Sequence, residues 1–238
     1  MSGILSMVSW DIRLQIRSHL YSATVFTTLA LCLVAYLLAP LDISPKLLAL
    51  LLFTDPAVIG LSFIGAFVLM ERGGNTLIAL ATSPLESTQY VAGKLVSFSL
   101  LGTVSGGIVA VVASGGSLNI ALLLIALLLS NIVAVLIGFA IAARTRSVNA
   151  FLAWMTIMLV VSVLPLMPYL SADPDYALLS LSIIPSFSML TLLEAGFSGS
   201  DVGIIEFGVH TVYLLIWAVA GWIWAIREYD AQLRQYVG

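Results

Sequence analysis

Long apolar stretches recur along this chain and constrain its fold more than any other feature. A bilayer with a hydrocarbon core about 30 Å thick is crossed by an α-helix of about 20 apolar residues. Six stretches approach or exceed that length, namely Tyr21–Ala39, Leu47–Met70, Tyr90–Ala113, Leu118–Ala142, Val148–Leu170 and Glu206–Ile226. Continuous runs such as Ile120–Leu129 lack the alternation of apolar and polar residues found in barrel strands. We therefore predict an all-α polytopic membrane protein, with six transmembrane helices in one transmembrane domain, residues 1–238.

The composition excludes an ordinary soluble domain. Charged residues make up 9% of the 238 residues and hydrophobic residues 61%, whereas about 25% of a soluble domain is charged. The lone Cys32 lies inside the first apolar stretch, so no disulfide framework is possible and we interpret it as an apolar filler. The first stretch is too long for a cleaved signal peptide, and Pro40 stands where a small residue is needed. We expect the lipid bilayer as a partner and no nucleic acid.

The basic residues predict the orientation, because cytoplasmic loops are enriched in Lys and Arg. With the N-terminus inside, the inner segments hold eight of the nine basic residues, namely Arg13, Arg17, Arg72, Lys94, Arg144, Arg146, Arg227 and Arg234. Only Lys46 falls outside. The segment between spans five and six carries acidic residues and no Lys or Arg. Both termini are therefore predicted to be cytoplasmic, in a multi-pass protein of the plasma (inner) membrane.

Residues 1–20 predict a helix lying in the membrane interface. Leu5, Val8, Ile12 and Ile16 recur at helical spacing, and polar residues such as Asp11, Gln15 and Arg13 take the other faces. Arg side chains suit phosphate headgroups and Trp suits headgroup level. Either a simple anchor or a force-transmitting helix fits this pattern.

Residues 171–205 form a predicted outer loop with a re-entrant segment. Its apolar part, Ile183–Leu193, is too short to cross the bilayer and is flanked by acidic residues. Such a segment could line an exit or could only pack against the spans.

In the third span, Gly102–Gly106 matches the spacing of small residues that lets membrane helices approach closely. We interpret it as a packing motif within the subunit.

Asp55 is the acid most deeply placed in an apolar stretch. It precedes Pro56, and proline is favoured in the first turn of a helix, so Asp55 predicts a helix cap and a break in the second span. Acids at membrane depth are costly and usually functional, so Asp55 is also a candidate for the substrate pathway, where it would meet a cationic group.

A polar interruption between spans two and three, residues 71–88, contains a short apolar helix. Asn75 suits its start, and Leu77, Ile78 and Leu80 share one face. Ser83-Pro84-Leu85-Glu86 then has the pattern of a capping box that starts the next helix. A turn of apolar helix outside the bilayer predicts a docking element for another protein.

The residues of this loop resemble those of permeases of the type-2 ABC exporter family. The matching positions are Glu71-Arg72, Gly74-Asn75-Thr76-Leu77, Leu80, Ser83-Pro84-Leu85 and Gly93-Lys94. The resemblance extends over the whole topology and looks closest to small bacterial permeases of fluoroquinolone export, with Thr54–Gly60 and Ile184-Pro185 in support. One departure is Ile78, which stands where the family often has an acid.

The resemblance implies that Thr76–Ala81 is a coupling helix docked on a separate ABC ATPase, with Glu71 and Arg72 at the membrane edge. The implied complex has two ATPase subunits and a second permease, identical or paralogous. It moves a small amphiphilic molecule outward by alternating access. ATP and Mg²⁺ belong to the partner subunit, because Thr88 stands where a Walker motif ending in Gly93-Lys94 needs glycine. We expect no cofactor, metal or catalytic residue in this chain, and we interpret Lys94 as a surface anchor.

Three alternatives stay open. A haem-export permease for cytochrome maturation has a similar loop. Ser198 with His210 superficially matches an intramembrane serine protease. A passive scaffold or channel would need no ATPase. Glu206 and His210, four residues apart, are expected to form a structural pair rather than a metal site.

Overall fold

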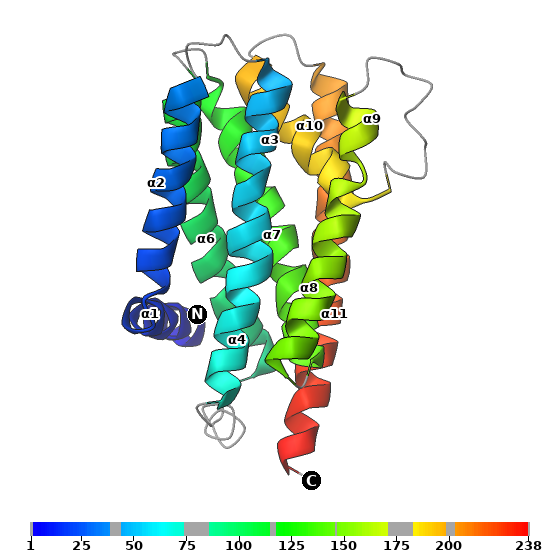
Figure 1. Cartoon of the computed structure of the whole chain (residues 1–238). Helices are drawn as coiled ribbons and strands as arrows, with labels where there is room; N and C mark the ends of the chain where they lie inside the picture. Colours follow the sequence, from blue (N-terminus) through cyan, green and yellow to red (C-terminus); the bar gives the residue numbers. More distant parts are fainter. Residues whose placement is uncertain are drawn as a thin grey trace.

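A computed structural model describes residues 2–38, 44–73, 86–114, 118–145, 147–170, 183–198 and 203–237. The secondary structure in these ranges is helical throughout, which confirms the all-α prediction (Figure 1). In chain order the helices are α1 (Ser2–Arg17), α2 (Leu20–Leu38), α3 (Pro45–Asp55), the π-helix η2 (Pro56–Phe63), α4 (Ile64–Gly73), α6 (Ser87–Ala113), α7 (Ile120–Arg144), α8 (Val148–Val163), α9 (Leu166–Leu170), α10 (Pro185–Ser198) and α11 (Ile204–Val237).

Six helical segments of the described chain are long and apolar enough to cross a membrane. They are Leu20–Leu38, Pro45–Gly73, Ser87–Ala113, Ile120–Arg144, Val148–Leu170 and Ile204–Arg234. Each overlaps one of the six stretches expected from the sequence, so the six-span prediction is confirmed.

The central helix of the bundle is α7, and the other long helices surround it (Figure 1). It packs against α6, α11, α10, η2 and α4. Most of its side chains are buried, and its sequence is apolar on every face, as expected for a helix enclosed by others. By contrast α2 and α8 are peripheral and expose apolar side chains such as Phe26 and Trp154. Those surfaces are open to lipid or to a second subunit.

Small residues bring α6 close to α7. A Cβ atom added at Gly106 would lie 2.7 Å from Leu127 Cδ2, and one at Gly102 would overlap the Asn131 side chain. The Asn131 amide in turn donates a hydrogen bond to Leu127 O at 2.9 Å. The packing interpretation of the Gly102–Gly106 motif is therefore confirmed.

The second span is continuous through Asp55 and Pro56, so the predicted break is wrong. Helix α3 leads directly into η2, and Asp55 has helical backbone angles, φ −65° and ψ −57°. Pro56 has no N–H to donate, and the Thr54 hydroxyl donates to Leu51 O at 2.7 Å. The Asp55 side chain makes no capping hydrogen bond, so the helix-cap interpretation is also wrong. Single π-helical turns are frequent at functional sites.

Helix α1 lies across one end of the bundle rather than along it (Figure 1). The chain turns from α1 into α2 through His19, whose φ of 60° is left-handed. The Ser18 N–H donates to Leu14 O at 2.9 Å and closes the end of α1. Helix α1 packs on α6 and α2, and it exposes Trp10 and Ile16. Its position in the membrane interface stays a prediction.

The segment predicted to be re-entrant forms α10, a helix of 14 residues near the end of the bundle opposite α1 (Figure 1). Fourteen residues span about 21 Å, which is less than the hydrocarbon thickness. It packs against α3, α7 and α11, and Leu190, Leu192 and Leu193 are fully buried. Helix α10 is therefore part of the core, and its re-entry into the membrane stays a prediction. Residues 171–182 and 199–202 of the predicted outer loop lie outside the described residues.

Candidate functional site

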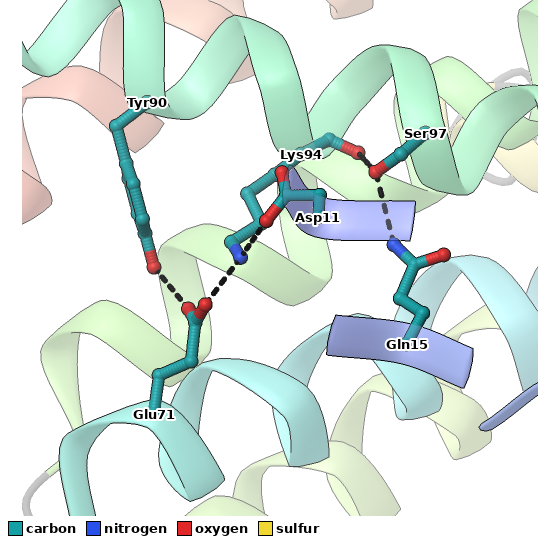
Figure 2. A network of polar contacts seen from close by, with 6 residues as sticks. All are labelled: Asp11, Gln15, Glu71, Tyr90, Lys94 and Ser97. Carbon is teal, nitrogen blue, oxygen red and sulfur yellow. Dashed lines mark hydrogen bonds and ion pairs between the residues drawn. The ribbon is translucent and has the colours of Figure 1, made fainter. Parts of the chain in front are cut away.

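A buried ion-pair network joins three helices at the loop end of the bundle, the end where α4 stops and α6 starts. The Lys94 ammonium of α6 donates to Asp11 Oδ1 of α1 at 2.5 Å and to Glu71 Oε1 of α4 at 2.7 Å (Figure 2). The side chains of Lys94 and Asp11 are 0% exposed and that of Glu71 is 1% exposed. We call Asp11, Gln15, Glu71, Tyr90, Lys94 and Ser97 the loop-end network.

Two hydrogen bonds and an aromatic stack extend the network. The Tyr90 hydroxyl donates to Glu71 Oε2 at 2.5 Å, and the Gln15 amide donates to Ser97 Oγ at 3.0 Å (Figure 2). The Tyr90 ring stacks on Tyr229 of α11, with centroids 4.5 Å apart. Four helices, α1, α4, α6 and α11, are thus held at one place.

Aromatic rings surround the Lys94 ammonium. It lies 4.2 Å from the centroid of the Phe67 ring and 5.0 Å from that of Tyr90. Cation–π attraction is strongest where water is excluded, so these rings stabilise a charge that is costly to bury.

The network holds two carboxyl groups for one ammonium. Burial raises the pKa of Asp11 to about 6, although the adjacent Lys94 ammonium acts in the opposite direction and Glu71 adds to the rise. Asp11 Oδ2 has no hydrogen-bond partner among the residues that the structure describes. The Asp11 carboxyl therefore changes its protonation near neutral pH, and the pairing of α1 with α6 is sensitive to pH.

Gly93 explains how α1 approaches α6 so closely. A Cβ atom at this position would lie 2.6 Å from Met7 Cγ and 3.3 Å from Asp11 Oδ2. The Gly93-Lys94 pair thus combines a small residue that admits α1 with a cation that binds it.

Arg72, next to Glu71, holds the same end of α4 against α7. Its guanidinium donates to Thr145 O and, at 3.0 Å, to Ala143 O. These carbonyls belong to the C-terminal end of α7, where cations interact favourably with the helix dipole. The first two residues of the loop are therefore tied to different helices: Glu71 to α6, whose Lys94 also binds α1, and Arg72 to α7.

The rest of the predicted coupling loop lies outside the described residues. This applies to Gly74, Asn75, Thr76, Leu77, Leu80, Ser83 and Pro84. The predicted role of Glu86 in a capping box is wrong, since α6 begins at Ser87 and Glu86 is its N-cap in extended conformation. The Glu86 carboxylate accepts from the Thr88 hydroxyl at 3.2 Å, and Ser83, the other end of the predicted box, lies outside the described residues.

The interpretation of Lys94 as a surface anchor is wrong, because Lys94 is fully buried. The sequence reasoning also missed Asp11, Gln15 and Tyr90. The available signal was the spacing of Asp11 and Gln15, which lie four residues apart and so share one face of a helix. That face packs on α6, while the apolar side chains of Trp10 and Ile16 stay exposed.

Asp55, the candidate for the substrate pathway, lies away from the loop-end network. It is 2% exposed and its Oδ1 lies at hydrogen-bond distance, 2.7 Å, from the Ser105 hydroxyl oxygen of α6. Ser105 Oγ in turn lies 2.7 Å from Thr28 Oγ1 of α2. The structure thus brings Asp55 together with hydroxyl groups, whereas the hydrogen bonds of Glu71 and Arg72, the other predicted site residues that the structure describes, go to Tyr90, Lys94 and the end of α7.

An apolar cavity of about 350 Å³ lies between the second span, α7, α8, α10 and α11. Pockets for drug-sized molecules begin at about 300 Å³ and are mostly apolar. Six of the lining residues are Phe53, Leu61, Met158, Ser186, Trp217 and Trp224. Two serines, Ser162 and Ser186, also line the cavity. Among the described residues the Ser186 hydroxyl is buried without a hydrogen-bond partner, so it offers a polar group among apolar walls.

His210 contacts a serine other than the one expected for a protease. Its Nδ1 lies 2.9 Å from Ser188 Oγ on α10, and Ser188 is 2% exposed. A nucleophile must reach its substrate, and a buried hydroxyl packed inside the bundle does not. This geometry gives no support to the hypothesis built on Ser198.

The six-span bundle, with polar groups buried at one end and an apolar cavity among its helices, defines a polytopic membrane protein. A model of the fluoroquinolones export permease protein family matches residues 2–236. The chain therefore belongs to this family of export permeases. It is 26% identical over 219 residues to proteins of two Mycobacterium tuberculosis strains, both named fluoroquinolones export permease protein. The aligned region covers 92% of this chain and 91% of each relative.

Proposed function

We propose that this chain is the membrane-spanning permease subunit of an ATP-binding-cassette exporter that moves a small amphiphilic molecule outward. Its loop, residues 71–88, docks on a separate ATPase, with Thr76–Ala81 as the coupling helix. ATP and Mg²⁺ bind to that partner. Membership of an export permease family supports the transport role, and the resemblance of the loop to that of type-2 ABC exporter permeases supports the partner.

The observation that carries this proposal is the loop-end network. Glu71, only two residues before the last residue of α4, pairs with Lys94 at 2.7 Å, and Lys94 pairs with Asp11. The neighbouring Arg72 binds the end of α7. A push on the loop is therefore passed to α1, α6 and α7 together. Buried charges resist separation because each would be left unpaired, so these helices move as one body.

The proposed assembly contains two ATPase subunits and two permeases, which are identical or paralogous. The exposed apolar side chains of α2 and α8, such as Phe26 and Trp154, offer surfaces for the second permease and for lipid. We place the complex in the plasma (inner) membrane with both termini of this chain in the cytoplasm. ATP-driven closure of the two ATPase subunits then moves the permease helices between inward-facing and outward-facing states.

We propose a drug-like amphiphile as the substrate, in agreement with the relatives named for fluoroquinolones. The apolar cavity supports this class, because its walls are almost entirely hydrocarbon and aromatic. Two Trp side chains in the wall suit a flat aromatic body.

The test is to purify the tagged chain after co-expression with its genomic neighbours, and to measure copurification of an ATPase and ATP hydrolysis. The double substitution Leu77→Asp/Leu80→Asp places charge on the proposed docking face. It should release the ATPase or abolish the stimulation of its activity by a fluoroquinolone.

The matched control is Ala231→Asp, which adds a charge at an exposed position near the C-terminal end of α11. This variant should keep the ATPase bound. Retention of a fully coupled ATPase by the double variant would show that the loop is not the docking element. Absence of any copurifying ATPase from the wild type would contradict the exporter proposal itself.

A further inference from the structure

A chain of polar side chains crosses from α3 to α2 inside the membrane-spanning bundle. Asp55 Oδ1 lies 2.7 Å from Ser105 Oγ, and Ser105 Oγ lies 2.7 Å from Thr28 Oγ1. Thr28 Oγ1 lies in turn 2.8 Å from the carbonyl oxygen of Thr24. Asp55 and Ser105 are 2% and 3% exposed, and Thr28 is also buried. We call this series the Asp55 relay.

The number of hydrogens available to the relay depends on whether the Asp55 carboxyl is protonated or ionised. Three short oxygen–oxygen contacts need three hydrogens, one for each contact. Ser105 and Thr28 supply one hydrogen each, and the Thr24 carbonyl supplies none because it only accepts. With Asp55 ionised, one contact would bring together two oxygens with no hydrogen between them. With Asp55 protonated, each group from Asp55 to Thr28 donates to the next, and Thr24 O accepts the last hydrogen.

The surroundings of Asp55 also disfavour a bare charge. Within the described part of the chain, Asp55 Oδ2 is buried without a hydrogen-bond partner. The cations on the helices packed around it have other partners: Lys46 donates to Tyr169 O, Lys94 pairs with Asp11 and Glu71, and Arg144 pairs with Glu228. An ionised carboxylate without a cation is far more costly inside a membrane than a neutral carboxyl whose carbonyl oxygen is unpaired.

Helices α3 and α6 meet closely at this site. A Cβ atom at Gly106 would lie 3.3 Å from Asp55 Oδ2, so only glycine leaves that space open. The π-helix η2 starts at the residue after Asp55, and π-helical segments inside α-helices are frequent at functional sites. A movement of α3 away from α6 would therefore open the relay and expose the carboxyl.

We propose that Asp55 is an intramembrane protonation site, which is neutral in this conformation and which, once ionised, binds the positive group of an organic cation. The exchange is balanced: the O–H bond of the carboxyl breaks, the proton goes to water, and the carboxylate pairs with the cation. No electrons are transferred. The cation-binding step rests on the proposed exporter function, whereas the protonated state does not.

The protonated state is tested by infrared spectroscopy of the purified chain in lipid nanodiscs at pH 8. At this pH Asp11 is ionised, because its pKa is about 6. The wild type should show the carbonyl stretch of a protonated carboxylic acid, and Asp55→Asn should remove it. Ser105→Ala should shift the band, since the Asp55 O–H loses its acceptor. A spectrum in which Asp55→Asn removes no such band would overturn the assignment.

The exchange step is tested with tetraphenylphosphonium as the cation, using the complete complex with its ATPase. Binding should release a proton and should weaken as the pH falls. Asp55→Asn keeps the shape of the relay, because its amide can donate to Ser105, but it should weaken cation binding about tenfold and abolish the proton release. An uncharged dye of similar size should bind both proteins equally. Unchanged tetraphenylphosphonium binding by Asp55→Asn would overturn the exchange, whatever the infrared result.

Discussion

Replacing Lys94 by Met should destabilise the protein strongly, because Lys94 is the only cation of the loop-end network. The substitution keeps the volume of the side chain and removes two contacts, at 2.5 Å to Asp11 and at 2.7 Å to Glu71. Removing one partner of a buried pair costs about 3–5 kcal/mol, since the other charge stays buried and unpaired. Without the Lys94 ammonium, which lowers the pKa of Asp11, that pKa rises further and Asp11 takes up a proton more readily than in the wild type. One of the two carboxylates is thereby relieved, so the total stays at about 3–5 kcal/mol rather than twice that amount.

The assay is thermal melting of the purified chain in nanodiscs. For a protein of this size each kcal/mol shifts Tm by roughly 2–4 °C, so Lys94→Met should melt about 6–20 °C below the wild type. Lowering the pH from 8 to 6 should restore part of this loss, because the Asp11 carboxyl can then take up a proton.

The control is the triple variant Lys94→Met/Asp11→Asn/Glu71→Gln, which removes the charges together. The new amide at position 71 still offers an oxygen that accepts from the Tyr90 hydroxyl. The triple variant should melt well above the single variant, because no carboxylate is left unpaired. If Lys94→Met melts within about 2 °C of the wild type at pH 8, less than the shift expected for a single kcal/mol, the reasoning from buried charge is refuted. The same conclusion follows if the triple variant is no more stable than the single one.

Two further predictions concern pH and packing. The pKa of Asp11 is raised from 3.8 to about 6 in the folded state, so its contribution to stability is complete below about pH 4 and is lost as the pH rises through 6. The loss amounts to about 3 kcal/mol; melting curves of the wild type should show this slope, and a slope unchanged in Asp11→Asn would contradict the assignment. Gly138→Ala should lower Tm by several degrees, because its Cβ would lie 2.5 Å from Leu61 O, a backbone atom that cannot move aside, and overpacking costs about 1–3 kcal/mol. Gly208→Ala is the matched control, since nothing lies within 4 Å of its Cβ; equal melting of the two variants would show that the α7 contact tolerates a methyl group.

The N-terminal helix illustrates how far the sequence reasoning reached. The spacing of its apolar residues correctly predicted a helix with two kinds of surface. The same spacing placed Asp11 and Gln15 among outward polar residues, whereas both are buried against α6. Their partners, Lys94 and Ser97, lie more than 80 residues further along the chain. A local pattern does not show which distant group a polar side chain will meet.

In the second span a strong local signal led to a wrong prediction. Asp-Pro is a strong local signal for the start of a helix, and it predicted a cap at Asp55. Burial among six spans overrides that preference, because backbone groups inside a membrane must stay hydrogen-bonded and a continuous helix achieves this. The Thr54 hydroxyl and the π-helical turn accommodate Pro56, and Asp55 is left to bond with Ser105 instead.

The sequence by itself determined the properties that a segment needs in order to lie in a bilayer. The lengths of the apolar stretches define the spans. The small fraction of charged residues excludes a water-soluble domain, and the glycine spacing in the third span predicts close helix packing. These properties depend on each segment and its solvent, so they are readable one segment at a time. Only the tertiary structure decided which polar groups meet: Lys94 with Asp11 and Glu71, and Asp55 with Ser105 and Thr28. The physical reason is that a buried charge or hydroxyl is stable only with a partner at hydrogen-bond distance, and in this protein those partners come from helices far apart in the chain.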